Sequence, residues 1–148
     1  MKLPSACFIA VIALGTARGA DVYDAIRNGD LASLRYSVTK ANVDTRGARG
    51  VTLLMHAAAF GNLETMKFLI ESGADVNARN DFGATALLWS ARDPQKAKLL
   101  IEFGANVNAQ SKQGRTPLMM AAMLDGGSEI VKLLLDKGGN PNARDTRG

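Results

Sequence analysis

The chain is poor in the residues from which most catalytic and metal-binding sites are built. It has one cysteine, Cys7, and one histidine, His56, in 148 residues. A disulfide needs two cysteines and a structural zinc site needs about four cysteine or histidine ligands, so this chain alone can form neither. It contains neither a nucleophile elbow nor a phosphate-binding glycine loop, and its carboxylates are scattered. We therefore expect no enzyme activity, no cofactor and no metal.

An excess of charge of one sign is also missing. The formal net charge is +4, and Lys2 and Arg18 contribute two of these charges from the first 20 residues, which contain no acidic residue. The remainder of the chain therefore carries a net charge of only +2. Nucleic-acid binding requires a dense basic patch that displaces counterions from many phosphates. The charge balance therefore disfavours a nucleic-acid partner.

Long apolar runs are absent except near the N-terminus. Lys2 is followed by an unbroken run of small and apolar residues, 6–14, and then by a segment rich in Gly and Ala, 15–20. These are the three regions of a signal peptide, and nine apolar residues are about half of what a membrane-spanning helix needs. We predict a bacterial-type signal peptide over 1–19, cleaved between about 17 and 20, and export to the periplasm or the extracellular space. A buried first helix is the alternative.

Beyond this leader the sequence repeats itself. One pattern begins at Gly73, Gly104 and Gly138 and a second at Gly50, Gly83 and Gly114, and the two keep the same phase. The first recurs after 31 and then 34 residues, and it reads GADVNAR, GANVNAQ and GGNPNAR. Such a period is typical of solenoids whose units stack on one another.

Each unit predicts two short helices. Thr52, Thr85 and Thr116 stand where a hydroxyl can accept hydrogen bonds from the free amides of a helix start, and Pro117 stands at a first helical position. Gly73 ends a second helix in the left-handed conformation that glycine adopts cheaply. We expect helices of about seven to ten residues, too short to be stable alone in water.

These patterns resemble the ankyrin repeat, with Thr116-Pro117-Leu118 beginning the nearest copy of its motif. The resemblance covers about residues 20–148 and implies an all-α ankyrin solenoid of about four helix-turn-helix units joined by β-hairpin loops. The expected units are about 20–47, 48–80, 81–111 and 112–144, with the start of a further unit at 145–148. We expect the natural chain, or that of its ancestor, to continue beyond Gly148 with more repeats or another domain.

The chain also departs from the family pattern. Met55, Leu88 and Met119 replace the motif histidine, and Asp93-Pro94 replaces the turn between the helices of the third unit, which is two residues short. His56 lies one position beyond the motif position, and we interpret it as a packing residue. Asp21, Asp24, Arg27 and Asp30 suit the first unit as an outward-facing cap. In the fourth unit, we expect five residues to face nothing: Ala121, Ala122, Ile130, Leu133 and Leu134.

The resemblance implies a protein partner bound across the hairpin tips and the first helices, which form one concave strip. The candidate binding residues, mapped from the family onto this sequence, are Arg49, Val51, Phe60, Arg79, Asp81, Phe82, Arg92, Lys112, Gln113, Arg115, Met123 and Leu124. The apolar members tend to mark interfaces when exposed, although local packing would also explain them.

The hairpins also carry a basic series, which is Arg46, Arg49, Arg79, Lys112, Arg115, Arg144 and Arg147. It suggests an acidic partner, and a solvated edge that keeps the array soluble is the alternative. The functional prediction is an exported, monomeric protein-interaction scaffold. The alternative function is the N-terminal recognition segment of a longer exported enzyme or redox protein.

Overall fold

The computed structural model describes residues 18–148, so the predicted signal peptide, apart from its last two residues, lies outside the described residues. Within them the chain forms eight α-helices and one 3-10 helix. These elements are α1 (Arg18–Asn28), α2 (Leu31–Ser37), η1 (Ala48–Gly50), α3 (Leu53–Phe60), α4 (Leu63–Glu71), α5 (Ala86–Trp89), α6 (Pro94–Glu102), α7 (Pro117–Ala122) and α8 (Ser128–Asp136). Because α1 begins at Arg18, it includes two residues that we assigned to the leader.

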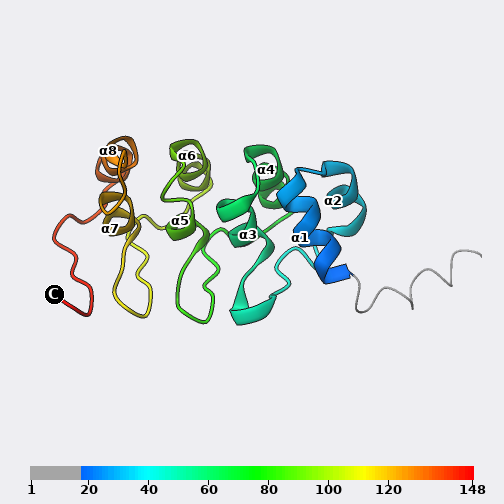
Figure 1. Cartoon of the computed structure of the whole chain (residues 1–148), viewed down its shortest axis with the longest axis horizontal. Coiled ribbons are helices and arrows are strands. Elements are labelled where there is room, and N and C mark those ends of the chain that lie inside the picture. The colour runs from blue at the N-terminus through cyan, green and yellow to red at the C-terminus, as the bar shows by residue number, and fades with distance from the viewer. Residues whose placement is uncertain (1–17) are drawn as a thin grey trace, which may run out of the picture.

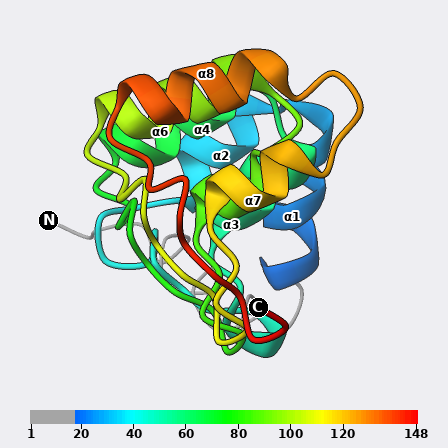
Figure 2. The same cartoon turned by 90° about the vertical axis from the view of Figure 1, so that its left-hand side faces the viewer.

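The helices pair within units, and the pairs stack along one axis (Figure 1). Each odd-numbered helix packs against the even-numbered helix that follows it, and like helices of neighbouring units also pack together. Viewed from the end (Figure 2), α2, α4, α6 and α8 form one layer, and the hairpin loops project away from it beyond the layer that contains α1, α3 and α7. The predicted ankyrin solenoid of about four units is confirmed.

The core lies between the two layers and continues from unit to unit. Leu54 and Leu87 of the first helices and Met66, Leu69 and Leu100 of the second helices are at most 1% exposed. The helices have between 4 and 11 residues, which leaves each of them marginal without its neighbours. Burial between adjacent units therefore stabilises them, as in other repeat arrays.

Two of the three predicted threonine caps form. The Thr52 hydroxyl accepts a hydrogen bond from the Met55 amide at 3.3 Å, and Thr116 accepts one from Met119 at 3.2 Å. The prediction for Thr85 is wrong, because its Oγ1 is buried and has no hydrogen-bond partner among the described residues. Thr85 opens α5, which is only one turn long in the shortened third unit, where we expected about seven residues or more.

The turn between the two helices of that unit contains a different helix cap, at the start of α6. The Asp93 carboxylate accepts hydrogen bonds from the amides of Gln95 and Lys96 at 3.0 and 3.1 Å, and Pro94 occupies the first position of α6. Both features are favourable at a helix start, because an amide there has no partner within the helix. The second helix of the unit therefore begins normally despite the missing residues.

The hairpin tips stack on one another through backbone hydrogen bonds. The amides of Asp81, Lys112 and Thr146 each donate to a carbonyl of the preceding hairpin, at 2.9 to 3.0 Å. Gly83 lies at such a contact with φ of +72°, and a Cβ there would come within 3.0 Å of the Lys112 amide. The residues 18–148 contain no extended strand, and the hairpins show only one isolated bridge, between Arg46 and Thr52.

The expectation for the fourth unit is wrong for its central residues. Ala121, Ile130 and Leu134 are at most 2% exposed, because α7 and α8 pack against each other and against the third unit. Ala122 is exposed and Leu133 is half-buried. At the other end, the exposed Asp24 and Arg27 of α1 form an ion pair, in agreement with a polar first unit.

No helix in the part of the chain that the structure describes is both long enough and apolar enough to cross a membrane.

Candidate protein-binding face

Two hollows lie on the side of the solenoid that carries the hairpins and the first helices. The first, which we call the aromatic hollow, has a volume of about 430 Å³ and is lined by Tyr23, Asp24, Arg27, Ala48, Val51, His56, Phe60 and Trp89. The second, the basic groove, has a volume of about 310 Å³ and is lined by Phe82, Ala84, Leu88, Trp89, Ser111, Lys112, Gln113, Arg115 and Met120. Trp89 borders both, so the two hollows are adjoining parts of one surface.

The aromatic hollow is built on contacts between the first two units. The ring of His56 meets that of Tyr23 edge-on, with centroids 4.7 Å apart, and lies 5.0 Å from that of Phe60. The Tyr23 hydroxyl donates to the Val51 carbonyl at 3.4 Å, and burial raises the pKa of this phenol. Three rings from α1 and α3 thus form one continuous wall, on which Phe60 remains 59% exposed.

His56 acts in this wall as a packing residue. Burial lowers the pKa of its imidazole below the ordinary value of 6.5, the charge of Arg27 lowers it further, and Asp24 opposes the shift. Its Nε2 is buried and has no hydrogen-bond partner among the described residues. This agrees with the interpretation of His56 as a packing residue.

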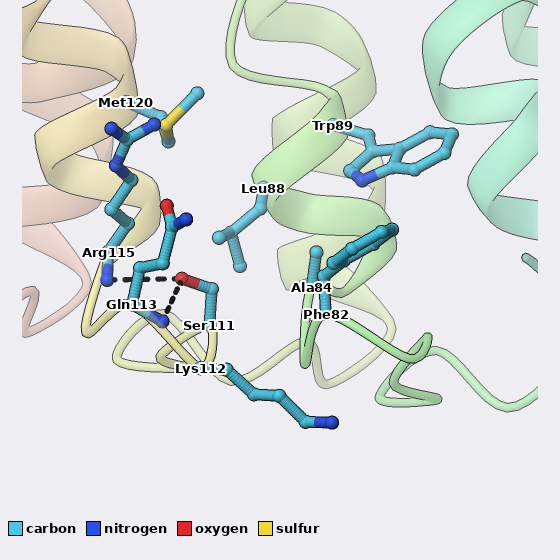
Figure 3. A pocket seen from close by; sticks show the side chains of 9 residues that line it. All are labelled: Phe82, Ala84, Leu88, Trp89, Ser111, Lys112, Gln113, Arg115 and Met120. Atoms are coloured by element: carbon cyan, nitrogen blue, oxygen red, sulfur yellow. Dashed lines mark hydrogen bonds between the residues drawn. The ribbon is translucent and has the colours of Figure 1, made fainter. Parts of the chain in front are cut away.

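The walls of the basic groove come from two consecutive hairpins, as Figure 3 shows. In one, Ser111 Oγ accepts hydrogen bonds from the amides of Gln113 and Arg115, both at 3.2 Å. In the other, the buried Asn80 accepts from the amides of Phe82 and Ala84 at 3.0 and 2.9 Å. Such side-chain to backbone bonds hold tight turns in shape. They therefore fix the backbone from which Phe82, Lys112 and Gln113 project.

The groove combines an apolar floor with a basic rim. Leu88 and Met120 line it together with Trp89, whose ring projects from α5 toward the preceding unit in Figure 3. Phe82 is 55% exposed, and the Arg49 guanidinium lies 5.9 Å from the centre of its ring. The described residues that line the groove include two cations, Lys112 and Arg115, and no carboxylate.

Two arginines of the basic series are used within the chain. The Arg46 guanidinium donates to the carbonyl of Arg79 at 2.6 Å, and the Arg79 guanidinium donates to the carbonyl of Gln110. Each bond joins a hairpin segment to the equivalent position of the next unit, 33 and 31 residues further on. The repeat spacing indicates this role, which was not predicted from the sequence. Arg79 stays a candidate binding residue, but its side chain already has a partner.

The three candidate residues that follow the ends of α5 and α7 lie elsewhere. Arg92, Met123 and Leu124 line a third hollow of about 420 Å³, and no described residue lines both it and either of the other two. Met123 is 71% exposed, whereas Leu124 is half-buried. The candidates Arg49, Val51, Phe60, Asp81, Phe82, Lys112, Gln113 and Arg115 belong to the hairpins or line the first two hollows.

The residue at the centre of the face was not among the candidates predicted from the sequence. Trp89 is the single tryptophan of the chain and occupies the repeat position of His56 and Met120. All three line the hollows. The sequence does contain a signal for this role, because a large aromatic residue stands at a position that consecutive units share. No group of three or more His, Cys, Asp or Glu side chains in the described part of the chain could hold a metal ion.

The fold and this face define a repeat solenoid with a continuous, partly apolar surface. The family model for ankyrin repeats (3 copies) matches residues 22–111 and 54–145, which is most of the chain. The chain therefore belongs to the ankyrin-repeat family. Membership of this family implies a module for binding protein partners.

The chain is similar to segments of several longer proteins. It is 38% identical over 71 residues to human M-phase phosphoprotein 8, which is 46% of this chain and 8% of that protein. It is 40% identical over 77 residues to the Arabidopsis thaliana E3 ubiquitin-protein ligase XBAT32, covering 49% and 15%. It is 38% identical over 66 residues to mouse protein phosphatase 1 regulatory subunit 27, covering 43% of each.

The chain thus spans less than half the length of each of these relatives. They come from mammals and a plant, so they do not support a bacterial type of protein. The predicted signal peptide receives no support from them either, and it stays a prediction.

Proposed function

We propose that this chain is a monomeric scaffold that binds one partner protein across the aromatic hollow and the basic groove, with Trp89 at the centre of the contact. The observation that carries the proposal is the position of Trp89 between two adjoining hollows whose rims expose Phe60 and Phe82. Tryptophan, tyrosine and arginine dominate the binding energy of protein interfaces, and all three line this face.

The partner presents an acidic surface to the basic groove. Lys112 and Arg115 line the groove without a carboxylate among the described lining residues, and Arg49 stands over the ring of Phe82. In the aromatic hollow, by contrast, Asp24 is paired with Arg27. Complementary charge at an interface accelerates association and sets its specificity.

Photo-crosslinking tests which face binds. A benzophenone amino acid is placed at Gln113, which is exposed on the rim of the basic groove, or at Lys98, which is exposed on α6. The full chain is expressed in its native cells and irradiated, and the adducts are identified by mass spectrometry. We expect a specific protein adduct from position 113 and none from position 98. Adducts from position 98 alone would place the binding surface on the outer layer and overturn the proposal.

The proposal includes export of the protein. Its support is the charged start at Lys2, the apolar run over 6–14 and the small residues that follow. The intact mass of the protein purified from its native source tests this directly. We expect a mature N-terminus between about residues 17 and 20, and an intact residue 2 would contradict export.

The same measurement addresses the alternative that the repeats are the recognition segment of a longer exported enzyme or redox protein. The observation that favours it is the similarity to E3 ubiquitin-protein ligases, because the segment that matches this chain is only 15% of each ligase. A mass well above 15.7 kDa would support the alternative.

A further inference from the structure

We infer that the partner is recognised through one extended peptide segment, which places a bulky apolar side chain in the aromatic hollow and a carboxylate a few residues away beside Arg115. This inference rests on the proposed function and specifies the chemistry of the partner. It follows from three features of the face: the rings of the first hollow, the cations of the second, and the side chain that the two share.

The aromatic hollow selects for an apolar group rather than a charged one. The ring centroid of His56 lies 4.7 Å from that of Tyr23 and 5.0 Å from that of Phe60, and burial lowers the pKa of the imidazole, which favours its neutral form. The Asp24 carboxylate is engaged by Arg27, so an incoming cation would meet both charges of an existing pair. An aliphatic or aromatic side chain gains the burial of its apolar area here without displacing an ion pair.

The basic groove supplies the second contact. Lys112 and Arg115 come from one hairpin, whose backbone Ser111 holds in place through two hydrogen bonds. A carboxylate at this rim would pair with Arg115, which no described lining residue neutralises and whose side chain runs toward Met120 in Figure 3. The apolar floor of Leu88 and Met120 lowers the local polarity beneath such a pair, which strengthens a charged contact relative to one in open water.

Trp89 makes the two contacts parts of one recognition event. Its side chain borders both hollows, so a segment that lies across its ring reaches both without leaving the surface. A second, distant segment of the partner is not required. The cations at the groove are also few, whereas a single-stranded nucleic acid would need a basic track along its backbone. The observations therefore favour a peptide that joins an apolar residue to an acidic one.

Random peptides displayed on phage provide the probe. They are selected on the full chain, and the enriched peptides are synthesised with a fluorophore and titrated by fluorescence anisotropy. We expect enriched peptides to share a bulky apolar residue with Asp or Glu a few residues away. Substituting Phe60→Ser or Trp89→Ala should weaken binding about tenfold or more. Phe60→Ser is the safer variant for folding, because Phe60 is 59% exposed.

A charge reversal tests the second contact. Arg115→Glu should weaken binding of the acidic peptide about tenfold, and a peptide with Lys in place of its acidic residue should regain affinity for this variant. Lys132→Glu, which makes the same charge change on the exposed face of α8, is the control and should alter affinity less than about twofold. Circular dichroism spectra establish that each variant is folded.

Several results would overturn the inference. Peptides enriched without an acidic residue, binding unchanged by Arg115→Glu, or effective competition by an oligothymidine would each do so. These results differ from failure of the proposed function: crosslinking through position 113 with peptides that lack the two anchors would remove this inference alone. Absence of crosslinking at that position would remove both.

Discussion

The ammonium group of Lys96 lies 3.2 Å from the carbonyl oxygen of Ala58, and the lysine is only 9% exposed. Ala58 belongs to the last turn of α3, and Lys96 lies in α6 of the next unit. The last carbonyls of a helix lack partners within it and carry its negative end, so a buried cation there is favourable. This contact joins the second and third units.

Replacement of this lysine should therefore weaken the array. Lys96→Met keeps the side chain unbranched, removes its ammonium group and leaves the Ala58 carbonyl without its donor. We expect the free energy of unfolding to fall by about 1–3 kcal/mol. Urea denaturation followed by circular dichroism measures this change. Lys98→Met, on the exposed side of the same helix, is the matched control and should cost less than about 0.5 kcal/mol. Equal effects of the two substitutions would show that the contact adds nothing.

The three repeat threonines should respond differently to replacement by valine. Thr52→Val and Thr116→Val each remove a helix cap, and we expect a loss of about 1 kcal/mol in the free energy of unfolding. Thr85→Val removes a buried hydroxyl that has no hydrogen-bond partner among the described residues, so stability should stay the same or rise. The measurement is chemical denaturation of the three variants in parallel. A loss at Thr85 as large as at the other two would contradict the assignment.

The stability of the protein should fall in mild acid because of His56. Unfolded, the imidazole takes up a proton near its ordinary pKa of 6.5, whereas the folded protein holds the pKa lower, mainly through burial and also through Arg27. Between the two values the unfolded state binds more protons, so the free energy of unfolding decreases as the pH falls through this range. Below the folded pKa the effect levels off.

Urea titrations from about pH 7.5 to about pH 5 compare the wild type with His56→Phe. We expect the stability advantage of the wild type over this variant to diminish as the pH falls through 6.5. Asp30, whose pKa is lowered by its bonds to Ser33, titrates at lower pH and is common to both proteins. Parallel stability curves over this interval would be evidence against a buried, neutral His56.

Arg79 and Gln110, which occupy the same repeat position, should respond differently to replacement by alanine. Arg79→Ala removes the bond from its guanidinium to the Gln110 carbonyl, and we expect a loss of about 0.5–1.5 kcal/mol in the free energy of unfolding. Gln110→Ala changes the equivalent residue of the next unit, for which no side-chain hydrogen bond occurs among the described residues, and should have an effect close to zero. Thermal and urea unfolding test both. Similar losses would indicate that position rather than hydrogen bonding matters.

Much of the architecture could be predicted because it depends on local chemistry. Glycine is needed where the backbone turns with positive φ, as at Gly73, and a hydroxyl satisfies the amides of a helix start, as at Thr52 and Thr116. Repetition of these signals revealed the units and their order. The prediction failed at Thr85, where the shortened unit leaves only one helical turn. It also failed at Ala121 and Ile130, which are buried because α7 and α8 pack against each other and against the third unit.

The residue pattern and its resemblance to ankyrin repeats were sufficient to predict the fold and the repeat phase, and they gave the candidate binding residues on the hairpins and first helices. Only the stacking of the units separated Arg92 and Met123 from the other candidates and engaged Arg79 within the chain. It also placed Trp89 between the aromatic hollow and the basic groove. The physical reason is that a hollow on a solenoid is walled by side chains from neighbouring units, and its shape depends on distances that no local sequence signal encodes.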